Sequence, residues 1–243
     1  MSLTILFIGA SLGCGRSALV TALQNGHTCI ALLRYPSKAD DLSEKYPDNL
    51  IVREGNAHSL EDVKGALVHQ GRLVDCVNTS IGLRPTGMSL KLADPEVCTK
   101  GMRTLIAALK EVRTQGNQGR PLVCALSTTG ISRSGVRDYP VLMYPLYHWG
   151  LAEPHADKRN MEETLAGSGE RFVIVRPSLL VDTDCPESDD KVRVSVEDAK
   201  TAEYEKIEVG YTISRGAVGR FITTRVLEKG GQSYEGKALA LTW

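Results

Sequence analysis

The feature that most constrains this chain is a set of glycines placed directly after a short apolar run. The run Thr4–Ile8 leads into Gly9, Gly13 and Gly15, and a helix-like pattern follows over Arg16–Asn25. A strand that leads through glycines into a helix is the context in which a glycine motif binds a dinucleotide. The alternative is an ordinary strand-to-helix turn with chance glycines, and the pattern on both sides of the loop argues against it.

Each glycine has a physical reason to stand where it does. Gly9 permits a tight turn off the strand, Gly13 lets the backbone approach a pyrophosphate, and Gly15 lets the helix pack closely on the strand. The exposed N–H groups and the positive dipole end of that helix then face the phosphates. We therefore expect the following loop residues to bind the cofactor: Gly9, Ser11, Leu12, Gly13, Cys14 and Gly15.

Apolar strand-like runs alternate with helix-like stretches along most of the chain. Repeated βα units with continuous apolar strands favour a parallel sheet with helices on both faces, so we predict an α/β, doubly wound Rossmann fold. The strand-like runs are Thr4–Ile8, Thr28–Leu33, Leu50–Arg53, Val74–Asn78, Pro121–Ser127, Phe172–Arg176 and Lys237–Thr242, and the helix-like stretches are Arg16–Asn25, Ala39–Lys45, Leu60–His69, Asp94–Arg113, Ala156–Gly167 and Ser214–Leu227. We expect a single NAD(P)-binding domain over residues 1–243, with residues 182–212 as a small loop or extension on the substrate side.

Two segments interrupt this alternation after the fifth and sixth strands. Val136–His155 is rich in Tyr, Pro, His and Trp, and Asp182–Asp198 is strongly acidic. Ligands of doubly wound sheets bind beyond the carboxyl ends of the strands, so both segments are candidate walls of a substrate site. We expect Val136–Trp149 to form an aromatic lid. For the acidic segment, a solvated surface loop is the preferred interpretation.

The charge balance of the chain argues against partners that bind through a strong electrostatic field. Its 243 residues carry 29 Lys and Arg against 29 Asp and Glu, so we expect neither nucleic acid nor a membrane as a partner. No apolar run approaches the ~20 residues that span a bilayer, and we expect no signal peptide. The expected partner is a small-molecule substrate, and the expected state is a monomer or a homodimer.

The six cysteines are scattered, without the C-x-x-C pairs or Cys/His clusters that bind metal. This usage fits a reducing compartment, and we expect a cytoplasmic protein with no metal site. Cys29, Cys76 and Cys124 lie in apolar runs and are expected to be small buried hydrophobes. Cys14 lies in the glycine loop, where a helix N-terminus would favour a thiolate. We prefer to interpret it as a tolerated loop residue, with a redox switch as the alternative.

Arg34 indicates which dinucleotide binds. About twenty residues past the glycines, NAD enzymes place Asp or Glu at the end of the second strand, where it holds the ribose 2′-hydroxyl. Here Arg34 takes that place, with Ser37 and Lys38 close behind. A guanidinium pairs with a 2′-phosphate and stacks on adenine, whereas a carboxylate would repel the phosphate. We therefore predict NADP(H) rather than NAD(H); the alternative is that Arg34 is only a surface charge.

Small polar residues follow the third and fourth strands, on the expected path of the cofactor. The amide of Asn56 can hydrogen-bond the adenine ring or cap the next helix, for which Ser59 is the better candidate. Asn78 and Thr79 end the fourth strand. We expect four of these residues to bind the cofactor: Asn56, Ala57, Asn78 and Thr79.

Longer motifs carry a family resemblance over essentially the whole chain. They are Gly9-x-x-x-Gly13-x-Gly15, Arg34-x-x-Ser37-Lys38, Lys158-x-x-x-Glu162-x-x-Leu165-x-x-Ser168-Gly169, Val175-Arg176-Pro177-Ser178, Ile213-Ser214-Arg215-Gly216-Ala217-Val218-Gly219 and Tyr234-Glu235-Gly236-Lys237. With them the chain resembles the atypical short-chain dehydrogenase/reductases, in the NmrA-like group that includes biliverdin reductase B (flavin reductase). The resemblance implies that Lys158 holds the nicotinamide ribose, that Ser127 and Thr128 flank the nicotinamide, and that the backbone at Pro177 and Ser178 touches its carboxamide.

The chain departs from the superfamily at the proton donor. Standard members use Tyr-x-x-x-Lys, with the tyrosine as general acid, but Pro154 stands four residues before Lys158. A positioned donor is typically worth about 10²–10⁴-fold in rate. The candidate substitutes are His155, Tyr144, Tyr147 and His148, of which we favour Tyr147 or His148 as catalytic beside Ser127 and Lys158. The resemblance implies another route, because biliverdin reductase B-like enzymes can take protons from solvent.

Three functions are compatible with these residues. We favour an NADPH-dependent reductase of a small planar or conjugated molecule, namely a flavin, quinone, tetrapyrrole or biosynthetic enone or ketone. The first alternative is a redox-sensing regulator that binds NADP(H) without turnover, which the absent tyrosine supports. The second is a non-redox isomerase or cyclase that reuses the pocket, since a fold does not by itself fix a function.

Overall fold

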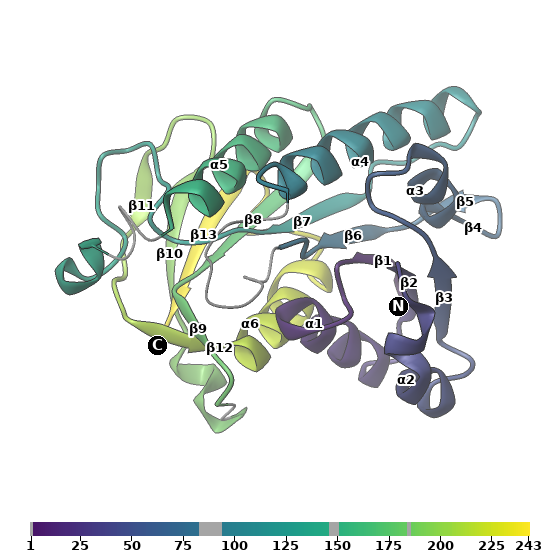
Figure 1. Ribbon diagram of the computed structural model, residues 1–243, viewed down its shortest axis with the longest axis horizontal. Coiled ribbons are helices and arrows are strands. Elements are labelled where there is room, and N and C mark those ends of the chain that lie inside the picture. The colour runs from purple at the N-terminus through teal and green to yellow at the C-terminus, as the bar shows by residue number, and fades with distance from the viewer. Residues whose placement is uncertain (1, 83–93, 146–150, 184–185) are drawn as a thin grey trace.

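A nine-stranded, mostly parallel sheet organises the computed structural model, which describes residues 2–82, 94–145, 151–183 and 186–243 (Figure 1). The strand order is β11-β10-β13-β8-β7-β6-β1-β2-β3. The strands are β1 (Thr4–Ile8), β2 (Thr28–Leu33), β3 (Leu50–Glu54), β6 (Cys76–Thr79), β7 (Leu122–Leu126), β8 (Arg171–Pro177), β10 (Arg193–Asp198), β11 (Tyr204–Lys206) and β13 (Lys237–Thr242). All pairs from β13 to β3 are parallel, and β10 and β11 add an antiparallel edge.

Helices cover both faces of this sheet, which confirms the predicted doubly wound α/β fold. One layer holds α1 (Gly13–Gln24), α2 (Asp40–Lys45), α6 (Arg215–Phe221) and the π-helical turn Ile222–Leu227 that continues α6. The other layer holds α3 (Leu60–Leu67), α4 (Val97–Thr114) and α5 (Ala152–Ala166). Strands β1, β2, β7 and β13 are continuous apolar runs because they are buried on both faces.

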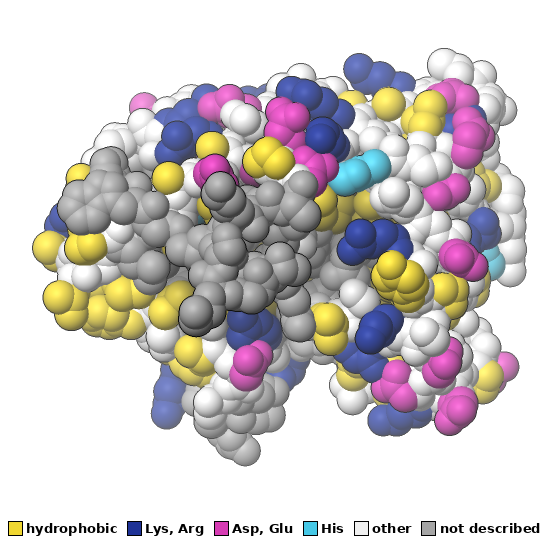
Figure 2. All heavy atoms as spheres, viewed as in Figure 1, with side chains coloured by type: hydrophobic (Ala, Val, Ile, Leu, Met, Phe, Trp, Pro, Cys, Tyr) yellow, Lys and Arg dark blue, Asp and Glu magenta, His cyan; other side chains and the backbone are white. Residues whose placement is uncertain are grey.

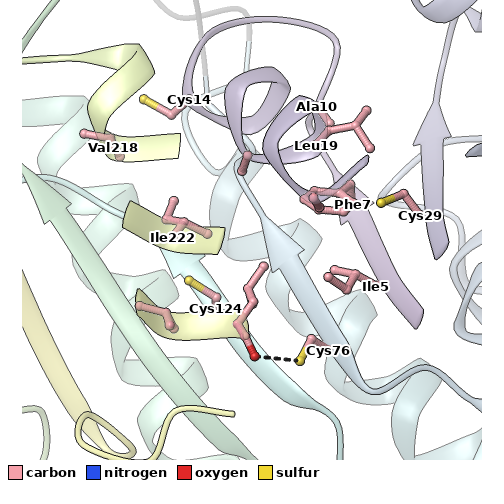
Figure 3. Close-up of a cluster of buried hydrophobic side chains, with 14 of the residues drawn as sticks. Ile5, Phe7, Ala10, Cys14, Leu19, Cys29, Cys76, Cys124, Val218 and Ile222 are labelled. Carbon is pink, nitrogen blue, oxygen red and sulfur yellow. Dashed lines mark hydrogen bonds between the residues drawn. The ribbon is translucent and has the colours of Figure 1, made fainter. Parts of the chain in front are cut away.

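The core between the sheet and the α1–α6 layer contains the cysteines of the apolar runs. Figure 3 shows Cys29, Cys76 and Cys124 among aliphatic and aromatic side chains, with Cys76 donating to the carbonyl of Leu227 at 3.9 Å. Burial raises the pKa of the Cys29 and Cys76 thiols to about 12. These cysteines are small buried hydrophobes, as predicted.

Helices α1 and α6 approach each other more closely than ordinary side chains allow. A Cβ placed on Gly219 of α6 would lie 2.4 Å from the Cβ of Ser17 in α1. The hydroxyl of Ser17 donates to the carbonyl of Gly216 at 3.0 Å, and that of Thr223 donates to the carbonyl of Ala18 at 2.9 Å. The N-terminal helix is therefore fixed to a helix near the end of the chain.

Several element boundaries differ from the predicted ones. The helix predicted over Leu60–His69 ends at Leu67, because Val68–His69 (β4) pairs with Arg72–Leu73 (β5) in a small hairpin. Gln70 and Gly71 form its turn, with φ of 51° and 74°. Two positive φ values are what a tight hairpin turn requires. The hairpin therefore ends the helix at that point.

The segment predicted as a substrate-side loop, residues 182–212, contains regular structure. Its strands β10 and β11 extend the sheet beyond β13, and a 3₁₀ helix (Pro186–Lys191) precedes them. Leu179–Val181 (β9) and Thr212–Ser214 (β12) pair in parallel on either side of the segment. A further 3₁₀ helix spans Pro36–Ala39 after β2, and another spans Val141–Met143 after β7.

Candidate active site

The glycine loop between β1 and α1 leaves room for a phosphate group. Gly9 has a φ of +80°, and a Cβ on it would lie 2.7 Å from the carbonyl carbon of Ser80. A Cβ on Gly15 would lie 2.5 Å from the carbonyl oxygen of Gly9. Gly13 has a φ of +62° and faces open space bounded by the side chain of Arg215. The tight turn, the open position and the close helix contact therefore fit a cofactor pyrophosphate over this loop.

The first turn of α1 lacks a capping side chain. Leu12 occupies the N-cap position without a side-chain hydrogen bond, and the turn contains no acidic residue. Its N–H groups thus keep their capacity to bind an acceptor, and the positive end of the helix points toward the loop. An anion is the ligand that such a terminus attracts.

The loop side chains divide between the surface and the core. Leu12 is exposed and Ser11 is half-buried, whereas Cys14 lies in the core near Val218 (Figure 3). Burial raises the pKa of the Cys14 thiol to about 12, and the charge of Arg215 offsets this only in part. The thiolate that a helix N-terminus would favour is therefore not formed, because desolvation is the stronger effect. Any contact of Cys14 with the cofactor would come from its backbone.

Arg34, Ser37 and Lys38 lie exposed after β2. Arg16 of α1 holds this segment, donating to the carbonyl of Lys38 at 2.8 Å and to both carboxylate oxygens of Asp41 at 2.6 and 2.8 Å. That hydrogen-bonded guanidinium also lowers the pKa of Asp41. Within the described part of the chain Arg34 has no such partner, so its guanidinium is available to a ligand.

The turn after β3 uses its polar groups locally. The Oδ1 of Asn56 accepts from the N–H of His58 at 3.0 Å, and the N–H of Asn56 donates to Asp62 at 2.8 Å. Ser59 caps α3 by accepting from the N–H of Asp62 at 3.3 Å. The preference for Ser59 as the helix cap is confirmed. The Nδ2 of Asn56 and the half-buried Ala57 remain candidates for the adenine.

Asn78 and Thr79 are buried at the end of β6. The Nδ2 of Asn78 donates to the hydroxyl of Ser80 at 3.2 Å. Ser80 in turn provides the backbone against which Gly9 packs. The structure thus places Asn78 beneath the glycine loop, where its side chain supports the turn.

Lys158 joins the ends of two central strands. Its Nζ donates to the carbonyl of Ile81 at 2.8 Å, just past β6, and to the carbonyl of Leu126 at 2.6 Å, the last residue of β7. Ser127 follows directly, with a side chain only 5% exposed and a buried hydroxyl that has no hydrogen-bond partner among the described residues. A buried hydroxyl without a partner is costly, and a ligand that hydrogen-bonds it would offset that cost. Lys158 and Ser127 therefore meet at the carboxyl end of the sheet.

Asp157 positions the helix that carries Lys158, and the sequence analysis missed it. Its carboxylate accepts from the N–H groups of Cys98 and Thr99 at 2.8 and 2.9 Å and from the hydroxyl of Thr99 at 2.6 Å. It thereby caps the N-terminus of α4 from a neighbouring helix. No local signal could have revealed this pair, because 58 positions separate Asp157 from Thr99.

The residues predicted around the nicotinamide carboxamide are engaged with neighbouring strands. The carbonyl of Pro177 accepts from the N–H of Thr129 at 3.2 Å. The hydroxyl of Ser178 donates to that of Thr242 at 3.2 Å. Thr128, which follows Ser127 in the chain, is half-buried. These contacts hold the segments after β7 and β8 together at the edge that also carries Lys158.

The candidate proton donors differ in their exposure to solvent. Tyr147 and His148 lie outside the described residues. Tyr144 is exposed, while His155 is only 7% exposed, and burial lowers the pKa of its imidazole to about 4, with the charge of Arg159 adding to the effect. His155 is therefore uncharged near neutral pH and is a poor general acid there.

A buried ion network lies behind the site on β8. Arg176 donates to both oxygens of Glu162 at 2.9 and 2.7 Å and to Glu197 at 2.6 Å. Although burial opposes its charge, the two carboxylates raise the pKa of Arg176. Nearby, Asp138 is 2% exposed, and burial raises the pKa of its carboxyl. The network joins α5, β8 and β10 into one unit.

A groove of about 1170 Å³ lies at the opposite edge of the sheet. Its lining includes residues at the amino ends of the strands: Leu3, His27, Asp75, Pro121 and Arg171. None of the predicted site residues lines it. Ligands of this fold bind at the carboxyl ends, so this groove is not the candidate active site.

The chain has relatives of known class. The model of a family described as NAD(P)H-binding matches residues 9–229. The chain is 38% identical to a protein named reductase pytE from Aspergillus terreus over 99% of this chain and 98% of that protein. It is 30% identical to oxidase pynE from Aspergillus niger over 98% of each. These likenesses extend over nearly the full length of each chain.

The fold is similar to that of solved structures. A short-chain dehydrogenase/reductase from Veillonella parvula DSM 2008, solved in complex with NADP, matches with a TM-score of 0.67 and 16% identity over 100% of this chain and 95% of that chain. At this identity the likeness concerns the fold. Among the residues described here, no helix has the length and apolar character to cross a membrane.

Proposed function

The chain belongs to the NAD(P)H-binding family and is an oxidoreductase with a nicotinamide cofactor, and on that premise we propose that it is an NADPH-dependent reductase of a small planar or conjugated substrate. Flavins, quinones, tetrapyrroles and biosynthetic enones or ketones are the substrate classes that we propose. The observation that carries the proposal is the meeting of Lys158 with the buried, unpartnered hydroxyl of Ser127 at the carboxyl end of the sheet.

The preference for NADPH rests on the exposed charges after β2. Arg34 takes the position that a carboxylate occupies in NAD enzymes, and within the described residues its guanidinium is unpaired. It would bind the 2′-phosphate through two parallel hydrogen bonds. Arg16 supports this arrangement, because it fixes the Lys38 segment to α1.

The chain's own residues would orient the reaction rather than supply much acid–base chemistry. A bound nicotinamide cofactor supplies the hydride. The ammonium group of Lys158 has three N–H donors, and two of them bind carbonyls at the strand ends. The third N–H would be available to the nicotinamide ribose. Ser127 would donate its hydroxyl proton to a hydrogen bond with the nicotinamide or the substrate. Without a tyrosine ahead of Lys158, we propose that the proton comes from solvent, or from Tyr147 or His148.

The surface around this edge supports an apolar substrate. Large apolar side chains are exposed to solvent in the segments that follow β7, β8 and β11: Val136, Val141, Leu142, Tyr144, Leu179, Ile207, Val209 and Tyr211. Figure 2 shows apolar side chains gathered at the left edge of its view. A contiguous apolar patch on a protein surface is typical of a binding site.

Calorimetric titrations with NADPH, NADP⁺ and NADH test the cofactor first. We expect NADPH to bind much more tightly than NADH, and Arg34→Ala to remove most of that difference. Arg103→Ala, which alters an exposed arginine on α4, is the matched control and should change nothing. Equal affinity for NADPH and NADH would contradict the preference. Absence of binding would contradict the function itself.

Oxidation of bound NADPH by a panel of flavins, quinones, tetrapyrroles and enones then tests the reaction. We expect at least one class to be reduced. If NADPH binds tightly and no acceptor oxidises it, the redox-sensing regulator becomes the better assignment, because the missing tyrosine already favours binding without turnover. Product formation without NADPH consumption would identify an isomerase or cyclase.

A further inference from the structure

Arg215, the first residue of α6, lies beside the glycine loop although 200 residues separate the two in sequence. The space over Gly13, where a side chain would stand, is bounded by the Cδ of Arg215 at 3.5 Å and by its Nε at 3.9 Å. The same space is the one that a cofactor pyrophosphate would occupy if the proposed function holds. Apart from the chain neighbours Leu12 and Cys14, no other described side chain lies within 4 Å of that position.

The packing of α6 fixes Arg215 in this place. Ser214 caps α6 by accepting from the N–H of Ala217 at 2.9 Å. One turn further on, Gly219 packs directly against Ser17 of α1, and the hydroxyl of Ser17 donates to the carbonyl of Gly216, so α6 is held against α1. Arg215 therefore extends from a rigid support toward the first turn of α1.

The guanidinium of Arg215 is held by a weak partner. It donates to the carboxylate of Asp182 at 2.8 Å and to the carbonyl of Leu180 at 3.4 Å. The side chain of Asp182 is 91% exposed. An ion pair this exposed contributes little stability and is screened by salt. A doubly charged pyrophosphate, already attracted by the uncapped end of α1, would compete well for the same guanidinium.

We propose that Arg215 is a ligand of the cofactor pyrophosphate and that Asp182 holds its guanidinium in place until the cofactor binds. On binding, the guanidinium exchanges the carboxylate of Asp182 for pyrophosphate oxygens. The same exchange leaves the exposed carboxylate of Asp182, which follows β9, without its cation.

The inference rests on the proposed cofactor, and fragments of that cofactor separate the two. ADP carries a pyrophosphate but no 2′-phosphate, whereas adenosine 2′-monophosphate carries the 2′-phosphate alone. We expect Arg215→Gln to raise the Kd of ADP and of NADPH by about ten- to a hundredfold, which corresponds to the loss of one charge-assisted contact. Calorimetry measures both values. Adenosine 2′-monophosphate should bind this variant unchanged. Arg34→Gln should show the reverse pattern with the two fragments.

Asp182→Asn supplies a test in the opposite direction. We expect it to strengthen ADP and NADPH binding several-fold, because the competing charge is gone, and to have no effect in the Arg215→Gln background. Unchanged ADP affinity in Arg215→Gln, or equal weakening of both fragments, would overturn the role of Arg215. If the wild-type protein binds none of these nucleotides, the proposed function fails instead.

Discussion

The burial of the Ser127 hydroxyl has no explanation in the packing of the described residues. The hydroxyl is buried without a partner beside the strand ends that Lys158 joins. We expect Ser127→Ala to lower kcat of NADPH oxidation by about ten- to a hundredfold, the loss of one hydrogen bond, and to change the NADPH Kd by a smaller factor. Ser195→Ala is the matched control, because that buried hydroxyl donates to the carbonyl of Glu208 in the β10 region. A wild-type kcat in Ser127→Ala would exclude a catalytic role for Ser127.

His155 links the protein's stability to pH. Its pKa is about 4 in the folded protein and about 6.5 in an unfolded chain. Between these values the unfolded state binds more protons, so the stability contributed by neutral His155 is present above about pH 6.5 and is lost as pH falls toward 4. We expect the free energy of unfolding of wild type to fall across this window by up to a few kcal/mol more than that of His155→Gln. Parallel denaturant curves at pH 7 and 5 measure the difference, and identical pH dependence would contradict it.

Single residues also mark the limit of what the sequence predicts. Gly9, Gly13 and Gly15 could be assigned roles because a turn, an open position and a close contact are local requirements. Asp157 and Arg215 could not, because their partners lie far away in the chain and become neighbours only in the folded protein. The burial of Cys14 is of the same kind: the helix terminus is visible in the sequence, but the core that surrounds the thiol is not.

At the scale of the elements, the contact of α1 with α6 requires a glycine at position 219 because the helices lie so close there. We expect Gly219→Ala to destabilise the protein by about 1–3 kcal/mol, because its methyl group would overlap Ser17. Gly65→Ala in α3 is the matched control. Among the described side chains only that of Arg53 approaches this position, at 3.8 Å, and alanine there should stabilise the helix by about 0.5–1 kcal/mol. Thermal unfolding of both variants measures this, and equal effects would contradict the close packing.

The elements that the sequence predicted well are the central ones. β1, β2 and β13 have the predicted bounds, since strands buried on both faces are continuous apolar runs. β10 and β11 were missed because they form an edge, where polar and apolar residues alternate within an acidic segment. The hairpin of β4 and β5 after α3 was missed as well, since the residues of β4 continue the helix-like pattern of α3.

At the scale of the whole molecule, the buried ion network around Arg176 joins β8 to α5 and β10, which are not hydrogen-bonded to β8 as neighbouring strands. We expect Arg176→Met to destabilise the protein by about 3–5 kcal/mol, because Glu162 and Glu197 would stay buried without a cation. The triple variant Glu162→Leu, Arg176→Met, Glu197→Leu should recover most of this loss. Thermal melting of both variants tests the expectation. A mild effect of the single change would show that the carboxylates are not held as the structure places them.

The contact between α1 and α6 also sets an order of events during synthesis. The glycine loop leaves the ribosome well before α6, because the hydrogen bonds that join α1 to α6 and its π-helical continuation span 199 and 205 positions. Domains complete such distant contacts only after the later segments are available. Until α6 has been synthesised, the nascent chain carries a glycine loop that lacks its supporting helix. We therefore expect the glycine loop to become competent for nucleotide binding only after α6 has packed on α1.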